Sequence, residues 1–414
     1  MKNDEKLYIA NHVCYEGLDE LQRLYLAAKL NCHTALDGPP GVGKTQSIVE
    51  IARILNLKLH TKNCSTRTTE SQIISFPTLS VKDGASVTTY TSGPLLRAMM
   101  EPGIFYGDEF NLLKEDVQKR LNSAFDDRAQ IDRMDGMVIS AKPGFWGVIS
   151  YNPTQSIASR DLEDSVADRF IHFHYHKWDP DFNAYISTLK AYSSLKKAGR
   201  LPSEKDFGIE LQTRAFYNDK FYVLNANKDK SVWRNFFTGT EENVNPEIIY
   251  KVYDRSSIYK KIAAEADRQK LLTELNTQAY SEKEFARVLS RFTELITSLN
   301  ETGSSSILKK IGLSDLHEKE DLELLAVHPA STRIESAALK HYLYLLDRGM
   351  GRYLAQSYAV RLVIDQICYG QYRDKKLRDN TAYSLINLIA RSFRLFADNA
   401  KYNTRLITEN LFQN

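Results

Sequence analysis

Residues 38–45 are the part of this chain best suited to binding phosphate. Their sequence, Gly-Pro-Pro-Gly-Val-Gly-Lys-Thr, fits the pattern of Gly, any four residues and Gly-Lys-Thr that is typical of a phosphate-binding loop. Small residues here let successive backbone N–H groups approach phosphate oxygens. Lys44 can then reach the β- and γ-phosphates, and Thr45 can offer its hydroxyl to Mg²⁺. These residues predict a site for ATP and Mg²⁺.

Two acidic residues, Asp108 and Glu109, follow the apolar run 103–107, about 60 residues beyond the loop. Asp108 can hold Mg²⁺ directly or through water, and Glu109 can polarise the attacking water. Taken alone, the pair would be better explained as solvated residues at the end of a strand. Together with the phosphate loop, it favours the second half of an ATP site.

Asn152 ends another apolar run, residues 145–151. The carboxyl ends of parallel strands line one crevice, so Asn152 can orient the water or contact the γ-phosphate there. The alternative is an ordinary strand-end cap beside Pro153.

The segments around these residues alternate between strand and helix patterns. Residues 33–37 and 57–62 are predicted strands, and the helix between them carries Ile48, Ile51 and Leu55 on one face. This strand-loop-helix context argues against a chance glycine-rich turn. A helix over residues 17–30 and a last strand over 170–175 complete an α/β pattern with a parallel sheet.

Two Asp-Gly pairs predict β-hairpins, one within residues 76–90 and one within residues 130–141. Asp-Gly between strand-like flanks is a strong hairpin signal because both positions tolerate positive φ.

The second half of the chain has a different pattern. Residues 259–275 and 283–299 read as amphipathic helices, residues 303–306 as a connector, and residues 205–250 mix short aromatic strands and loops whose place in the fold we leave open. A capping box from Thr332 to Glu335 opens a helix over residues 332–346, and helices over 354–368 and 383–396 follow. Arg333 lies in the first helical turn, where a cation gains nothing from the dipole, so it is either a phosphate contact or an exposed arginine.

Composition argues against membrane-spanning proteins and gives little support to nucleic-acid binding. The 414 residues carry a net charge of only +3, which gives no argument for a large nucleic-acid footprint, although a local basic patch is compatible with it. The polar start and the lack of an 18-residue apolar window predict neither a signal peptide nor a membrane span. The four cysteines are scattered and show no ligand spacing, which favours reduced thiols in the cytoplasm.

Three histidines alternate along the last predicted strand, at positions 172, 174 and 176. Side chains on one face of one strand project in parallel and rarely converge on a metal. We therefore interpret His172, His174 and His176 as a polar strand face and not as a metal site.

The order of these parts resembles that of the MoxR-type AAA+ ATPases. The resemblance is carried by the phosphate loop, the hairpin insert, Gly-Pro-Leu-Leu-Arg-Ala at 93–98, Asp-Glu-Phe-Asn at 108–111, Asn-Pro at 152–153 and Asp-Arg-Phe at 168–170. Ser-Thr-Arg at 331–333 is similar to the CbbQ/NorQ and gas-vesicle GvpN branch. The resemblance covers residues 15–178 and 328–366. It implies an AAA+ nucleotide-binding core at 1–178 and a helical lid at 328–414. The segment 179–327 between them, which the resemblance does not cover, is predicted to be a mainly helical insertion or extension of unknown role.

The resemblance also implies roles for single residues. Glu109 and Asn152 would be catalytic, Asn152 as sensor 1, and Arg169 would be the arginine finger that acts on a neighbouring subunit, with Arg160 as the rival candidate. Arg333 would be sensor 2, contacting phosphate from the lid. The metal ligands would be Thr45 and Asp108, and the residues of the nucleotide site would be Gly38, Pro39, Pro40, Gly41, Val42, Gly43, Lys44, Thr45, Gln46, Asp108 and Arg333. Gly107 departs from the family, which has a bulky apolar residue there, so we expect a looser strand end.

The activity that the resemblance implies is ATP-driven remodelling of a partner protein by a homo-oligomeric ring, a hexamer, whose two hairpins face the pore. A protein with a von Willebrand A domain is an expected partner. Two other functions are compatible with the sequence: a nucleic-acid motor or restriction-type translocase, and a nucleotide-gated scaffold with little hydrolysis.

Overall fold

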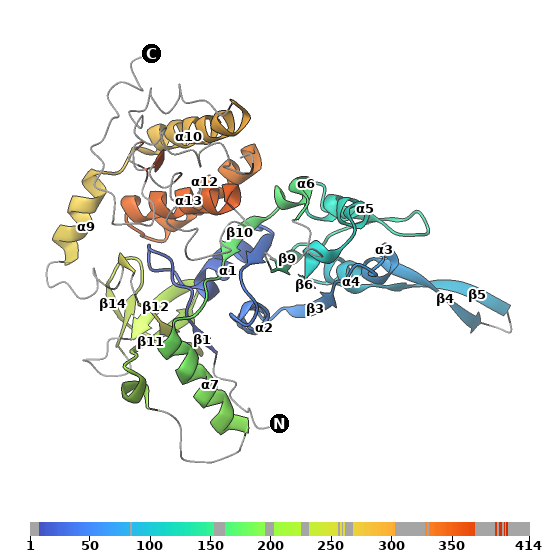
Figure 1. The fold of residues 1–414 in the computed structure, drawn as a ribbon, viewed down its shortest axis with the longest axis horizontal. Coiled ribbons are helices and arrows are strands. Elements are labelled where there is room, and N and C mark those ends of the chain that lie inside the picture. Colours follow the sequence, from blue (N-terminus) through green and yellow to red (C-terminus); the bar gives the residue numbers. More distant parts are fainter. Residues whose placement is uncertain are drawn as a thin grey trace.

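The computed structural model describes the following residues: 8–82, 85–152, 162–194, 203–224, 232–255, 257–258, 260, 268–302, 328, 331–368, 386, 389–390, 393 and 395. These residues form a parallel sheet with helices on both faces, a second sheet beside it, and a group of helices from the C-terminal region (Figure 1). These are the parallel α/β architecture and the helical C-terminal region that the sequence predicted.

The central sheet has strand order β10-β2-β9-β6-β3 within the described residues, and all its pairs are parallel. Its strands are β2 (Thr34–Asp37), β3 (Lys58–Asn63), β6 (Gly103–Asp108), β9 (Trp146–Tyr151) and β10 (Ile171–His174). Asp37 pairs with Tyr151, and Gly107 pairs with Ile149. The carboxyl ends of β2, β9 and β6 therefore meet at one edge of the sheet, as predicted.

Helices cover both faces of this sheet because successive strand residues point to opposite sides. Ile104 and Tyr106 pack in the apolar cluster that contains α1 and α2, whereas Phe105 packs in the cluster that contains α4. The elements around the sheet are α1 (Glu20–Lys29), α2 (Lys44–Leu55), α3 (Glu70–Ile73), α4 (Pro94–Met100), α5 (Glu115–Arg120), α6 (Asp164–Ala167) and the 3₁₀ helices η1 (Phe110–Leu112) and η2 (Asn122–Ala124). α1 begins three residues later than predicted because the Asp19 carboxylate accepts a hydrogen bond from Gln22 N and caps it.

Both predicted hairpins are present. β4 (Ser75–Lys82) pairs antiparallel with β5 (Ala85–Ser92), and β7 (Gln130–Asp132) pairs antiparallel with β8 (Val138–Ser140). The β4–β5 hairpin projects from the sheet domain, away from the C-terminal helices (Figure 1). Its central Asp83-Gly84 lies outside the described residues.

A second sheet is formed by strands within residues 211–253, which lie between the core and the C-terminal helices in the sequence, together with β1, which precedes the core. Its order is β1-β15-β11-β12-β13-β14, and it contains β1 (Ile9–Ala10), β11 (Leu211–Tyr217), β12 (Lys220–Leu224), β13 (Val232–Asn235), β14 (Glu241–Asn243) and β15 (Ile248–Tyr253). The sequence analysis expected short strands within 205–250 without placing them, and its description of 179–327 as mainly helical does not cover this sheet. The helices of this region are α7 (Pro180–Ser194), the 3₁₀ helix η3 (Glu204–Phe207), α9 (Arg268–Thr277) and α10 (Glu282–Thr302).

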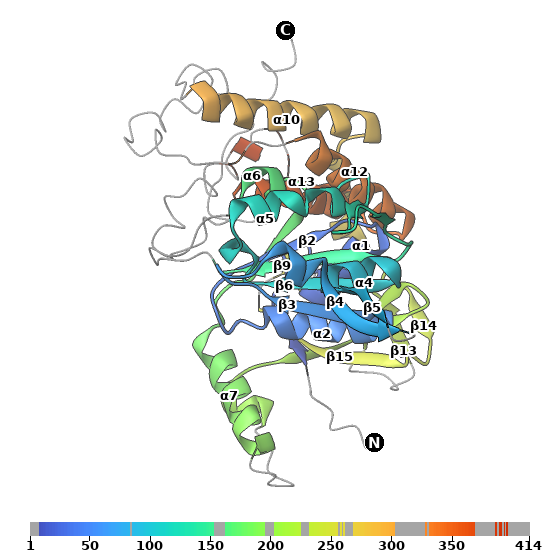
Figure 2. The same cartoon turned by 90° about the vertical axis from the view of Figure 1, so that its right-hand side faces the viewer.

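The C-terminal helices pack against the central sheet. α13 (Arg352–Ile367) is buried from Tyr353 onward and lies beside β10, while α10 lies outside α12 (Thr332–Asp347) and α13 (Figure 2). Ser331 caps α12 by accepting a hydrogen bond from Arg333 N, so the predicted cap at Thr332 is shifted by one residue. The predicted helix at 383–396 falls mostly outside the described residues.

One apolar cluster includes residues of α1, α2, α10, α12 and α13, so the sheet domain and the C-terminal helices share a core. The division of the chain into three domains stays a prediction. In the described part of the chain, no helix combines the length and the apolar composition needed to cross a membrane.

Candidate functional site

The phosphate loop joins the carboxyl end of β2 to the start of α2. Gly43 precedes α2 with φ of 95°, a left-handed conformation that glycine adopts without steric cost. A Cβ at Gly38 would lie 2.3 Å from the Tyr175 carbonyl oxygen, so the loop passes too close to the chain after β10 for a side chain. Pro40, Gly41, Thr45 and Gln46 are exposed on this loop and the first turn of α2.

Lys44 and Asn152 meet at this edge of the sheet. The buried Lys44 ammonium donates hydrogen bonds to Gly38 O at 2.6 Å, Pro39 O at 3.0 Å and Asn152 Oδ1 at 2.7 Å. Burial lowers the pKa of Lys44 to about 8, and the charges of Asp37 and Asp108 oppose this shift. The structure therefore joins two predicted residues that are 108 positions apart.

Thr45 and Asp108 form the part of the site that suits a metal. Thr45 Oγ1 lies 3.5 Å from Asp108 Oδ2, and both side chains offer hard oxygen ligands. Mg²⁺ prefers such oxygens and commonly binds one or two protein side chains together with substrate phosphates. The residues present therefore fit Mg²⁺ bound with a nucleotide.

Glu109 follows directly and has φ of 54°, a left-handed conformation that is uncommon outside glycine. Its backbone N–H donates to Asp108 Oδ1 at 3.1 Å. The expected loosening at Gly107 does not occur, because Gly107 pairs with both Lys62 and Ile149. A Cβ there would lie 2.7 Å from the Phe110 ring, so the glycine makes room for that ring.

Several residues that support the loop carried no sequence signal. The His12 ring donates from Nε2 to Val42 O at 2.9 Å, and the Tyr175 hydroxyl lies 2.8 Å from Ser47 Oγ. The His12 and Tyr175 rings also pack together, with centroids 4.2 Å apart. Burial lowers the pKa of His12 to about 3, which keeps the ring neutral. These contacts join segments far apart in sequence, and no local pattern could have revealed them.

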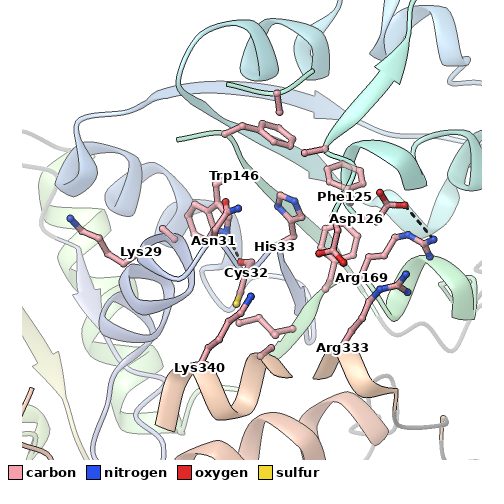
Figure 3. Close-up of a pocket in the computed structure, with 18 of the residues that line it drawn as sticks. Lys29, Asn31, Cys32, His33, Phe125, Asp126, Trp146, Arg169, Arg333 and Lys340 are labelled. Atoms are coloured by element: carbon pink, nitrogen blue, oxygen red, sulfur yellow. Dashed lines mark hydrogen bonds and ion pairs between the residues drawn. The ribbon is translucent and has the colours of Figure 1, made fainter. Parts of the chain in front are cut away.

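Arg169 and Arg333 lie together at the opposite edge of the sheet. β10 runs from Ile171, beside Thr34, to His174, beside Asp37, so Arg169 precedes the end of β10 that is distant from the phosphate loop. Both arginines line a cavity of about 1000 Å³ between the sheet and α12 (Figure 3).

The two arginines differ in their partners. Arg333 Nη1 donates to Asp168 Oδ2 at 2.7 Å, whereas Arg169 Nη1 donates to Ser165 O. Burial and the nearby charge of Arg333 lower the pKa of Arg169. The predicted contact of Arg333 with the phosphate of its own subunit does not fit this arrangement, because Asp168 holds it at the far edge of the sheet. The rival finger, Arg160, lies outside the described residues.

The three histidines of β10 and the following residues have separate surroundings. The His172 Nδ1 lies 3.1 Å from the Tyr151 hydroxyl, and the His174 Nδ1 lies 3.1 Å from Asp37 Oδ2. His176 is exposed, and its ring centroid is 4.6 Å from that of His174. The lack of a metal at this strand stays a prediction.

Comparisons with known proteins support a relation over the sheet domain. Residues 33–170 match the family described as AAA domain (dynein-related subfamily). An uncharacterised protein of Staphylococcus epidermidis is 31% identical over 145 residues, which are 34% of this chain and 55% of that protein. An uncharacterised protein of Staphylococcus aureus strain USA300 is 30% identical over 186 residues, which are 44% of this chain and 70% of that protein. A crystal structure of a candidate ATPase from Cytophaga hutchinsonii is 15% identical with a TM-score of 0.49, and the match covers 89% of this chain and 87% of that one.

Proposed function

This chain belongs to the AAA family (dynein-related subfamily), and from that premise we propose that it binds ATP with Mg²⁺ and hydrolyses it. The observation that carries the proposal is the meeting of Lys44, Thr45, Asp108 and Asn152 at one edge of the parallel sheet. Lys44 and Thr45 begin α2, Asp108 ends β6 and Asn152 follows β9, and each has the chemistry that one part of a bound triphosphate needs.

In hydrolysis, water attacks the γ-phosphorus, the bond to the β–γ bridging oxygen breaks, and the water gives up a proton. Lys44 neutralises charge on the β- and γ-phosphates, and Asn152 orients the γ-phosphate or the water. Glu109 accepts the proton or aligns the water. When bound, Mg²⁺ supplies positive charge to the phosphates, and Thr45 and Asp108 would hold it.

We further propose that Arg169 and Arg333 act on the nucleotide of a neighbouring subunit. Both line one cavity at the edge of the sheet opposite the phosphate loop, so their own nucleotide lies across the sheet from them. AAA+ proteins typically form rings, and a hexamer would place this edge against the next subunit's nucleotide. An arginine supplied in this way is worth on the order of 10³ or more in rate.

The exposed residues of the two hairpins support a protein substrate. Apolar side chains are exposed on both hairpins: Leu79, Val81, Met134, Met137 and Val138. The cation of Arg133 in the second hairpin is paired with Asp135. Such surfaces suit polypeptide better than a phosphate backbone, which requires clustered lysine and arginine. We therefore propose a MoxR-like remodelling ATPase, of the CbbQ/NorQ/GvpN branch, with a client protein and a von Willebrand A domain partner.

Phosphate release from ATP by the purified protein, with and without Mg²⁺, tests the proposal. We expect Mg²⁺-dependent turnover that double-stranded or single-stranded DNA does not raise. Turnover stimulated several-fold by DNA would favour the nucleic-acid motor, and tight binding with no turnover would favour the nucleotide-gated scaffold.

A further inference from the structure

We propose that Tyr106 and Ser150, two buried residues of the central sheet, position the Asp108 carboxylate for the metal ion. This inference rests on the proposed function. Tyr106 is 1% exposed in β6 and Ser150 is 0% exposed in β9. Neither residue belongs to the motifs that predicted the ATP site. In the sequence, both lie within apolar runs and are indistinguishable from ordinary buried strand residues.

The Tyr106 hydroxyl lies at the centre of a small hydrogen-bonded group. It is 2.8 Å from Ser150 Oγ, 3.1 Å from Thr45 Oγ1 and 3.2 Å from Asp108 Oδ1. Ser150 Oγ also donates to Asp108 Oδ1. Three elements, β6, β9 and α2, therefore meet through these hydroxyl groups at the two residues that would hold Mg²⁺.

The two oxygens of Asp108 have different surroundings. Oδ1 accepts from Glu109 N at 3.1 Å and from Ser150, and it lies within reach of the Tyr106 hydroxyl. Oδ2 faces Thr45 at 3.5 Å. A carboxylate whose Oδ1 is held by several donors cannot rotate freely, so Oδ2 stays on the side of Thr45, where a metal ligand is needed. Partners of this kind orient metal ligands in many sites.

The Thr45 hydroxyl gives Tyr106 a second role. A hydroxyl that binds a metal through its oxygen must direct its proton to another acceptor. Asp108 Oδ2 at 3.5 Å and the Tyr106 oxygen at 3.1 Å are the acceptors that this structure places beside Thr45. The Tyr106 oxygen can accept a hydrogen bond from Thr45 while the Tyr106 hydroxyl donates one to Asp108 Oδ1. One phenol group therefore holds both metal ligands in place.

A purely structural role is the competing explanation, because the Tyr106 ring also packs in the apolar cluster between the sheet and α2. Tyr106→Phe separates the two roles, since phenylalanine fills almost the same volume and removes only the hydroxyl. Ser150→Ala removes the second donor with a small change in volume. Tyr222→Phe is the matched control, because Tyr222 is also 1% exposed and its hydroxyl bonds Glu242 in the other sheet.

The experiment measures binding of a fluorescent ATP analogue, first in EDTA and then across a Mg²⁺ titration. Mg²⁺ should strengthen binding of the analogue, and we expect the Mg²⁺ concentration that gives half of this increase to rise about tenfold or more in Tyr106→Phe and in Ser150→Ala. Removal of a residue that holds a metal ligand typically lowers metal affinity by this much. Nucleotide affinity in EDTA should stay within about twofold of wild type, and Tyr222→Phe should match wild type in both conditions.

The possible results separate this inference from the proposed function. Wild-type Mg²⁺ dependence in both Tyr106→Phe and Ser150→Ala would overturn the inference and leave the proposed function intact. An equal loss of affinity in EDTA and in Mg²⁺ would show a structural role and would also overturn it. If the wild-type protein binds no nucleotide at any Mg²⁺ concentration, the proposed function fails, and the inference fails with it. Should Tyr106→Phe not fold, Ser150→Ala decides alone.

Discussion

Lys44 and Glu109 lie at the same edge of the sheet, but they act at different stages of the proposed reaction. The Lys44 ammonium donates hydrogen bonds to three oxygens of the protein, and a bound triphosphate would offer it stronger, anionic acceptors. Glu109 is half-buried in a left-handed conformation after β6, and its carboxylate is needed only when water reacts. Binding and turnover should therefore be separable by mutation.

We expect Lys44→Ala to abolish nucleotide binding, and we expect Glu109→Gln to bind ATP normally while turnover falls by about 10²–10⁴-fold, the usual contribution of a general base. Fluorescent-nucleotide binding and phosphate release measure the two properties on the same samples. Full hydrolysis by the Glu109→Gln protein would contradict the role of Glu109.

The histidines of β10 lead to a second prediction at the scale of residues. We expect purified protein to contain no stoichiometric transition metal at His172, His174 and His176, because His172 already contacts Tyr151 and His174 contacts Asp37. Burial also lowers the pKa of His172 to about 4, which suits a neutral ring hydrogen-bonded inside the protein. Elemental analysis checks this, and a bound metal that disappears when the three histidines are changed would show the prediction wrong.

At the scale of elements, buried ion pairs join the C-terminal helices to α1 and the segment before it. Arg361 of α13 donates to Glu16 at 2.8 Å, and Asp365 of the same helix accepts from Arg23 of α1 at 3.2 Å. Glu16 is fully buried and Arg361 is 7% exposed. Removal of one partner would leave a buried charge without its counter-charge, which costs far more than the loss of a surface pair.

We expect Arg361→Met to lower the free energy of unfolding by about 3–5 kcal/mol because it leaves the buried Glu16 carboxylate without its counter-charge. The control Lys58→Met breaks a pair with Glu101 in which both side chains are exposed, and it should cost much less. Urea unfolding measures both. A loss for Arg361→Met no larger than that of the control would contradict the importance of this buried pair.

The Glu16–Arg361 pair predicts how the free energy of unfolding depends on pH. Burial alone would raise the pKa of Glu16, but Arg361 and Ser357 outweigh it, and the pKa of Glu16 lies below its ordinary 4.5. A carboxylate whose pKa is lower in the folded state stabilises the fold above pH 4.5 and loses that contribution as pH falls through the folded-state pKa. Wild type should therefore lose stability below pH 4.5 more steeply than a Glu16→Gln, Arg361→Met double variant, which acid titration of unfolding can measure.

The accuracy of the sequence analysis differs between elements for physical reasons. The phosphate loop, the strand ending at Asp108 and both Asp-Gly hairpins are set by local residue patterns, and the structure contains all of them. Short strands were expected within residues 205–250, but their assembly into one sheet with β1 was not, because β1 and β15 pair across more than two hundred residues and no local period encodes that pairing. The sequence also could not show that Arg333 lies beside Asp168, because the packing of α12 decides which edge of the sheet Arg333 reaches, and its contact with a phosphate of its own subunit stays a prediction.

At the scale of the whole molecule, the two edges of the central sheet carry complementary halves of the proposed site. One edge presents the phosphate loop, Asp108, Glu109 and Asn152, and the other presents Arg169 and Arg333 beside a cavity. Repeated head-to-tail contact between unlike edges closes into a ring when the rotation allows it. Each nucleotide would then have a loop from one subunit and two arginines from the next.

This arrangement predicts that inactive variants can complement one another. Lys44→Ala and Arg169→Ala proteins should each be inactive, and their equal mixture should recover up to roughly a quarter of wild-type turnover, since one random interface in four joins an intact loop to intact arginines. Turnover per subunit should also rise with protein concentration as rings assemble. If mixed rings form without activity, or if Arg169→Ala hydrolyses normally, Arg160 becomes the leading candidate for the finger.

A second mixing experiment decides whether Arg333 acts on the nucleotide of its own subunit or on that of a neighbour. If Arg333 acts on the neighbouring subunit, a mixture of Lys44→Ala and Arg333→Ala should recover activity, because the Lys44→Ala subunit supplies Arg333 to the intact loop of its neighbour. If Arg333 serves its own nucleotide, no interface in that mixture has both Lys44 and Arg333, and activity stays lost at every ratio. The 2.7 Å bond from Arg333 to Asp168, one residue before Arg169, places both arginines at the same edge, so we expect the two mixtures to recover alike. A mixture of Lys44→Ala with a Lys44→Ala, Arg333→Ala double variant contains no intact loop and is the control for activity that does not come from a shared site.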